Sequence, residues 1–143
     1  FRLSNFLIIV SNMIDKPTIQ ITHISFDSVE LVYKNGDSGQ QYLSIVYVNG
    51  IRKQWLFYPD YIIKTADGNI WIIETKGGMQ AGHTKNIDRQ VENKFNAFKE
   101  YAKKYNLHWG FVRDIDEELY INNTIYTEDM SGDNWIPLDD VLK

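Results

Sequence analysis

Hydrophobic and polar residues follow two periods along the chain. Apolar residues recur at helical spacing over residues 3–14 and 87–105, which predicts two amphipathic helices. Between these helices, β-branched and aromatic residues form short runs separated by turn-forming residues, a pattern typical of strands. These runs cover residues 18–26, 29–33, 41–48, 53–65 and 69–76. Beyond the second helix, the sequence predicts a strand over 107–115, a short hairpin over 118–127 and a last helical turn over 136–143.

The order of these elements predicts an α/β domain with a mixed central sheet flanked by helices. A chain of 143 residues, of which 43% are hydrophobic, is expected to form a single domain over residues 1–143 with one core. Because the chain begins at Phe1 and not at Met, just before the first predicted helix, we expect it to be a piece of a longer protein.

The amino-acid composition indicates the type of cellular compartment in which the protein works. The chain has no cysteine, which excludes disulfides and thiolate metal sites and favours a reducing, cytoplasmic compartment. No apolar run approaches the roughly 20 residues of a membrane span, so no membrane partner is expected.

The stretch FYPDYIIKTADGNIWIIETKGG, residues 57–78, places charged residues inside two strongly apolar runs. Three of them stand out: Asp60, Glu74 and Lys76. The ADG segment predicts a three-residue hairpin loop with glycine in the left-handed region. That loop would pair residue 65 with residue 69 and put Asp60 opposite Glu74. Since side chains alternate along a strand, Lys76 points to the same face as Glu74.

Two buried carboxylates that face each other are costly unless a cation neutralises them. Mg²⁺ suits such a place, because it takes oxygen ligands and often only one or two carboxylates. A divalent ion polarises a phosphoryl oxygen and activates a water, while a neighbouring lysine stabilises the developing charge. The arrangement predicts a metal-dependent phosphodiesterase site. The alternative is that these charges lie at strand ends and reach water.

The segment Tyr-Pro-Asp, a turn and then Ile-Trp-Ile-Ile-Glu-Thr-Lys-Gly resembles the PD-(D/E)XK nuclease superfamily. It is most similar to the C-terminal nuclease domain of type III restriction subunits and of DEAD/DEAH-type restriction helicases. The resemblance is tight over residues 58–77 and looser over 54–112. It implies a restriction-endonuclease-like core, Mg²⁺ (with Mn²⁺ as a substitute) bound by Asp60, Glu74 and the carbonyl of Thr75, and Lys76 as the catalytic lysine. Many relatives add an acid from the first helix; here either Asp15 contributes or that ligand is absent.

Five further residues are candidates for contact with DNA. Gln90 and Lys94 lie one turn apart on the second predicted helix, and in related nucleases such a pair points into the site. Gly77 would let a DNA backbone approach closely, while His83 and Lys85 belong to the following Gly-rich loop, expected over 77–86. The alternatives are an ordinary turn, an exposed loop histidine and a solvated helix face.

Charge is unevenly distributed. The net charge is −4, whereas proteins that hold DNA alone are usually basic. Residues 76–104 nevertheless carry seven Lys or Arg against three acids, and residues 114–140 carry nine acids and no base. Its charge would allow the basic segment to face phosphate, whereas the acidic tail could not.

The expected function is Mg²⁺-dependent endodeoxyribonuclease activity within a type III-like restriction-modification helicase–nuclease. The expected partners are double-stranded DNA, a helicase/ATPase region of the same polypeptide and a DNA methyltransferase subunit. Two alternatives stay open: a catalytically inactive DNA-binding or scaffolding module on the same fold, and a DNA repair or junction nuclease.

Overall fold

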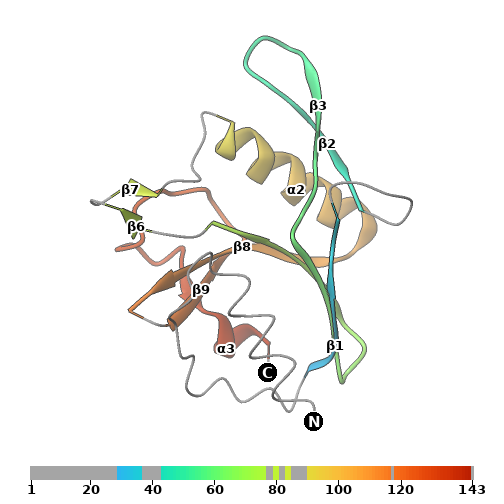
Figure 1. Ribbon diagram of the computed structural model, residues 1–143, viewed down its shortest axis with the longest axis vertical. Helices are drawn as coiled ribbons and strands as arrows, with labels where there is room; N and C mark the ends of the chain where they lie inside the picture. Colours follow the sequence, from blue (N-terminus) through green and yellow to red (C-terminus); the bar gives the residue numbers. More distant parts are fainter. Residues whose placement is uncertain are drawn as a thin grey trace.

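The computed structural model describes residues 29–36, 43–76, 79–80, 83–84, 90–116 and 118–142. The predicted helix over 3–14, the predicted strand over 18–26 and Asp15 lie outside the described residues. The described part is built on a six-stranded sheet (Figure 1).

The sheet confirms the predicted mixed α/β class. Its strand order is β1-β4-β5-β8-β9-β10. Only β5 and β8 pair in parallel, and every other neighbouring pair is antiparallel. The strands are β1 (Val29–Lys34), β4 (Tyr61–Thr65), β5 (Ile70–Thr75), β8 (His108–Ile115), β9 (Glu118–Asn122) and β10 (Ile136–Pro137).

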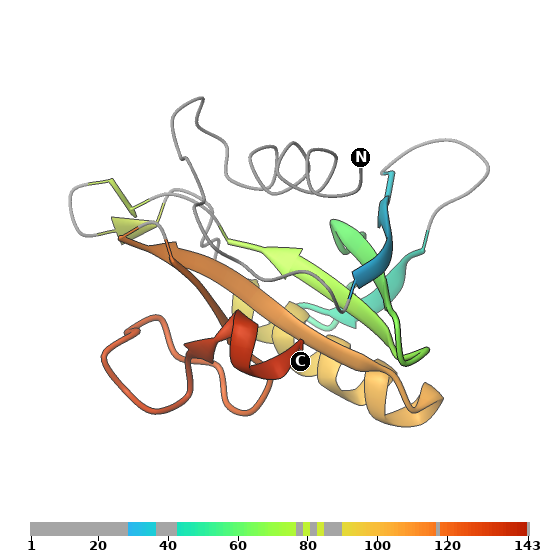
Figure 2. The same cartoon turned by 90° about the horizontal axis from the view of Figure 1, so that it is seen from below.

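Two apolar clusters cover the two faces of the sheet. Helix α2 (Val91–Tyr105) packs on one face of the sheet (Figure 2). There Phe95 and Phe98 are fully buried against Phe111 of β8. The short helix α3 (Leu138–Val141) closes the cluster on the other face, which contains Ile63 and Ile73. Because β5 lies between β4 and β8, its side chains are buried on both faces, as its apolar sequence predicts.

The predicted strand over 53–65 is divided at Pro59. Its first part, β3 (Gln54–Phe57), pairs with β2 (Ile45–Val48) in a separate two-stranded ribbon, and only its second part joins the main sheet as β4. Proline has no N–H for the strand ladder, so the chain changes sheets at this residue. In Figure 1 the β2–β3 hairpin projects beyond the end of the main sheet.

The predicted hairpin over 118–127 is wrong. Strand β9 ends at Asn122, and its second neighbour is β10, which lies after a long loop. The side chain of Asn122 turns the chain away from the sheet, since it accepts from the amide of Thr124 (3.0 Å) and donates to the carbonyl of Ile125 (2.8 Å). The predicted last helical turn is confirmed as α3.

Two predictions at the start of α2 also change. The helix begins at Val91 and not at residue 87, and its N-cap Gln90 makes no side-chain capping bond. The predicted loop over 77–86 contains a short ribbon formed by β6 (Met79–Gln80) and β7 (His83–Thr84). Lys85 of this loop lies outside the described residues.

Candidate active site

The β4–β5 hairpin sets the register of the candidate site. Tyr61 pairs with Ile73, and the pairing continues to the turn, where the Thr65 amide donates to the Asn69 carbonyl at 3.0 Å. Gly68 has a φ of 90°, the left-handed conformation that the closing residue of this loop requires. The predicted three-residue loop over 66–68 is therefore confirmed. Extending the same register outward places Asp60 opposite Glu74.

Thr75 fixes the orientation of the Asp60 carboxylate. Both the amide (2.8 Å) and the hydroxyl (2.6 Å) of Thr75 donate to Oδ2 of Asp60. The other oxygen, Oδ1, takes no hydrogen bond from the described part of the chain. The sequence predicted a role only for the Thr75 carbonyl. The predicted register could have indicated these hydrogen bonds, because it also brings Thr75, the residue after Glu74, next to Asp60.

Glu74 and Lys76 form a buried ion pair on one face of β5. The Lys76 ammonium donates to Oε1 of Glu74 at 2.5 Å and lies 5.1 Å from the ring centroid of Phe111. The Lys76 amide donates to the Val112 carbonyl at 2.8 Å, so pairing with β8 continues past the end of β5 and holds the lysine in extended backbone. The predicted convergence of Glu74 and Lys76 is thus seen in the structure.

The second oxygen of Glu74 is buried without a partner. Oε2 has no hydrogen bond among the described residues, although Glu74 is only 8% exposed. A buried carboxylate oxygen normally has a donor or a cation beside it. This oxygen therefore marks the position where a further positive group would fit best.

The pKa of Glu74 depends on its burial and on three nearby charges. Burial raises the pKa of Glu74 from its ordinary 4.5 to about 7, the Lys76 ammonium opposes this rise, and the negative charge of Asp60 adds to it. Lys94 on α2 also lowers the pKa of Glu74, though less. All three charged groups are thus close enough to Glu74 to influence its ionisation.

Asn35, which directly follows β1, connects the backbone of Pro59 and Asp60 to Leu43, two residues before β2. Its side-chain amide donates to the carbonyls of Pro59 and Leu43, both at 2.8 Å, and its Oδ1 accepts from the Leu43 amide at 2.8 Å. Its own amide donates to the Asp60 carbonyl at 2.8 Å. Asn35 lies between two predicted strands, 29–33 and 41–48, among turn-forming residues. Nothing in the sequence alone indicates that its side chain is buried.

The candidate DNA-contacting residues are only partly brought to the site. Lys94 is near enough to act on the pKa of Glu74, and its ammonium lies 5.7 Å from the ring centroid of Tyr47. Gln90 directly precedes α2 and accepts from Asn93 at 2.9 Å. Gly77 and Lys85 lie outside the described residues. For His83, only the backbone, in β7, is described.

Two carboxylate oxygens of the candidate site take no hydrogen bond from the described residues. No three His, Cys, Asp or Glu side chains gather into a ligand cluster in the described ranges. Two carboxylates are nevertheless enough for Mg²⁺, which keeps several waters. Oδ1 of Asp60 and Oε2 of Glu74 are both without hydrogen bonds within the described residues, and either would serve as a ligand.

Comparisons with protein-family models, with curated proteins and with solved structures find no match to this chain. Of the helices that the structure describes, none combines the length and apolar content that a membrane crossing needs. The candidate site must therefore be interpreted from its own chemistry.

Proposed function

We propose that this chain is an Mg²⁺-dependent endodeoxyribonuclease domain with a restriction-endonuclease-like core of the PD-(D/E)XK type. One observation carries the proposal. The β4–β5 register, extended by one pair, sets the half-buried Asp60 opposite the buried Glu74, and the ammonium of Lys76 forms an ion pair with Glu74. The resemblance of residues 58–77 to that superfamily supports the same interpretation.

The roles follow from the chemistry of each group. Asp60 and Glu74 would hold the ion, with Mn²⁺ as a substitute and the Thr75 carbonyl as a further donor. When bound, the ion supplies Lewis-acid polarisation of a phosphodiester. Lys76 then stabilises negative charge on the phosphoryl group, because its ammonium lies beside the same carboxylate. Thr75 keeps Asp60 in place through its two hydrogen bonds.

The proposal includes a cellular context. The substrate is double-stranded DNA. By the family resemblance, a helicase/ATPase region of the same polypeptide and a DNA methyltransferase subunit supply translocation and sequence recognition, in the cytoplasm. The acidic overall composition agrees with this division, since a nuclease module that is delivered to DNA needs little affinity of its own.

A cleavage assay tests the activity. Supercoiled plasmid is incubated with the chain and Mg²⁺ or Mn²⁺, with EDTA as the blank. We expect metal-dependent nicking that Lys76→Ala and Glu74→Gln each reduce at least 100-fold. Glu30 and Lys64 form an exposed ion pair across β1 and β4 at 2.9 Å, so Lys64→Ala and Glu30→Gln are matched controls that should retain activity. Equal nicking by wild type and Lys76→Ala would contradict the proposal.

A second candidate function is an inactive DNA-binding or scaffolding module. The observation that favours it is the Glu74–Lys76 ion pair, which neutralises one carboxylate without any metal. Calorimetry with Mg²⁺ separates the two functions. The nuclease requires binding that Glu74→Gln abolishes, whereas an inactive module predicts no such binding. A repair or junction nuclease would differ in substrate, and would cleave branched DNA faster than linear duplex.

A further inference from the structure

The β2–β3 hairpin carries exposed basic and aromatic side chains outside the site described above. Residues 43–58 contain Arg52 and Lys53 at the turn and no acidic residue, in a protein of net charge −4. Trp55 is 47% exposed, and the Lys53 ammonium lies 4.7 Å from its ring centroid. The side chain of Ile51 at the same turn is 81% exposed. None of these groups takes part in the core.

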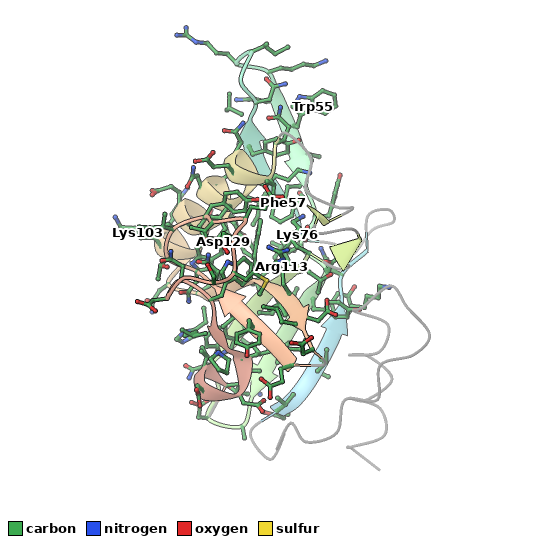
Figure 3. All side chains as sticks on the ribbon, turned by 90° about the vertical axis from the view of Figure 1, so that its left-hand side faces the viewer. Trp55, Phe57, Lys76, Lys103, Arg113 and Asp129 are labelled. Atoms are coloured by element: carbon green, nitrogen blue, oxygen red, sulfur yellow. The ribbon has the colours of Figure 1, made fainter. Side chains whose placement is uncertain are left out.

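Ring contacts and one electrostatic effect link this hairpin to the candidate site. Lys94, whose charge acts on Glu74, stands over the ring of Tyr47 in β2. Tyr47 is the cross-strand partner of Trp55 in β3, and Trp55 lies under Lys53. Positive groups therefore lie over the rings of two paired residues on one face of the ribbon. Figure 3 shows Trp55 toward the projecting end and Lys76 nearer the centre, with Phe57 between them.

From this arrangement we infer that the β2–β3 hairpin is a DNA-holding arm. It contacts the backbone of the duplex next to the bond that is cut. Arg52 and Lys53 pair with phosphates, Trp55 packs on a deoxyribose, and Lys94 contacts the strand between the arm and the site. This inference rests on the proposed function for the identity of the substrate, but it assigns a new contact surface.

Size and charge favour duplex DNA as the occupant. A two-stranded β-ribbon fits into the major groove of B-DNA, and phosphate and sugar contacts position such ribbons. The strand from Asp60 back to Lys53 spans on the order of 20 Å at about 3.3 Å per residue. Since duplex DNA rises about 3.4 Å per step along each strand, the arm would reach roughly six base pairs from the cut.

The β2–β3 ribbon also has an apolar face, to which a protein could bind in place of DNA. Val46, Val48 and Leu56 are exposed on the side away from Tyr47. A protein partner or a second copy of the chain could cover them. The two cations at the turn, without any acid in the hairpin, match a polyanion better, so DNA is the occupant we assign and self-association is an outcome of the test.

The first test uses tryptophan fluorescence. Trp71, Trp109 and Trp135 are buried, so Trp55 is the one tryptophan of the four with substantial exposure. The 143-residue chain is titrated in EDTA with a 20-base-pair duplex and with the corresponding single strand. We expect the duplex to change the intensity and blue-shift the emission. Trp55→Phe should abolish the change. An unchanged emission spectrum at saturating duplex, or a response to single strand alone, would overturn the inference.

The second test compares two variants with the same change in net charge. Arg52→Ala/Lys53→Ala removes the cations at the turn, and Lys103→Ala/Lys104→Ala removes two exposed cations from the last turn of α2. Binding of a fluorescein-labelled duplex is measured by anisotropy at several salt concentrations in EDTA. Each lost phosphate contact lowers the salt slope by about 0.9. We therefore expect the hairpin variant to lose affinity at least tenfold and about two units of slope.

The matched helix variant should keep both the affinity and the slope. Equal losses in both variants would contradict a specific role for the hairpin. Concentration-dependent dimerisation that Val46→Thr/Leu56→Thr removes, together with unchanged DNA affinity of Arg52→Ala/Lys53→Ala, would also contradict it. Because binding is measured without divalent metal, a chain that binds through the arm but never cuts would refute the proposed nuclease activity and not this inference.

Discussion

Thr75 donates two hydrogen bonds to a single oxygen of Asp60, one from its amide at 2.8 Å and one from its hydroxyl at 2.6 Å. Replacement by valine keeps the β-branched shape and the amide bond but removes the hydroxyl. We expect Thr75→Val to lower Mg²⁺ affinity about 10- to 100-fold, the usual effect of losing a group that orients a ligand. Calorimetry measures it. Thr75→Ser should restore the affinity, and an unchanged affinity of the valine variant would contradict the orienting role.

The buried Asn35 side chain holds the carbonyl of Pro59, the residue directly before Asp60. Asn35→Ala removes three hydrogen bonds and leaves the carbonyl of Pro59 without its donor. We expect a loss of about 1–3 kcal/mol in the free energy of unfolding, measured with urea, because the unpaired groups remain buried. Mg²⁺ affinity should fall as well. The exposed Asn69→Ala is the control, and it should leave metal affinity unchanged.

Glu74 makes stability depend on pH. Its pKa in the folded protein, about 7, lies above the ordinary 4.5, because burial disfavours the charged form. Its contribution to stability is therefore fully present below pH 4.5 and is lost as pH rises through about 7. Without metal, the unfolding free energy of wild type should fall across this range relative to Glu74→Gln. Parallel pH profiles of the two proteins would show that burial does not raise this pKa.

Metal binding should reverse that trend. Mg²⁺ favours the ionised carboxylate, so it should stabilise the fold more at pH 7.5 than at pH 5.5. At ten times the dissociation constant the gain is about 1.4 kcal/mol. Thermal melts with and without Mg²⁺ measure it. Glu74→Gln should lose the gain and Glu30→Gln should keep it; a gain that survives in Glu74→Gln would place the ion elsewhere.

Gly110 in β8 permits close packing of its neighbour. A Cβ at this position would overlap the side chain of Ile121, which is buried, and would lie 3.3 Å from the Asn122 carbonyl. We expect Gly110→Ala to cost about 1–3 kcal/mol of unfolding free energy, as overpacking of a core does. Gly132, which has open space around it, is the control, and Gly132→Ala should change stability by less than about 0.5 kcal/mol.

The sequence patterns correctly predicted those features of the fold that depend on local backbone geometry. The three-residue loop, the pairing of β4 with β5 and the shared face of Glu74 and Lys76 all follow from residue spacing and the twofold alternation of a strand. The sequence predicted one strand over 53–65, although Pro59 lacks the N–H that a strand ladder needs. It did not indicate that the chain leaves the main sheet there. The partner of β9 was mispredicted, because Asn122 turns the chain and the pairing residues come from 136–137.

Such patterns do not predict contacts between segments that are far apart in the sequence. Asn35 meets Pro59 across 24 residues, and no periodicity links them. The same applies to Lys94, whose helix lies over Tyr47 only because α2 packs against the ribbon. A residue that belongs to a recognisable turn motif can still be a buried connector once another strand covers it.

The loop over 66–68 determines which side chains can meet at the other end of its hairpin. Asp60 and Glu74 lie opposite each other only because this turn fixes the register in which the two strands pair. Deleting or inserting one residue there would shift one strand past the other and send one carboxylate to the opposite face of the sheet. A change in the length of this exposed loop would thus separate the two carboxylates as completely as the removal of one of them.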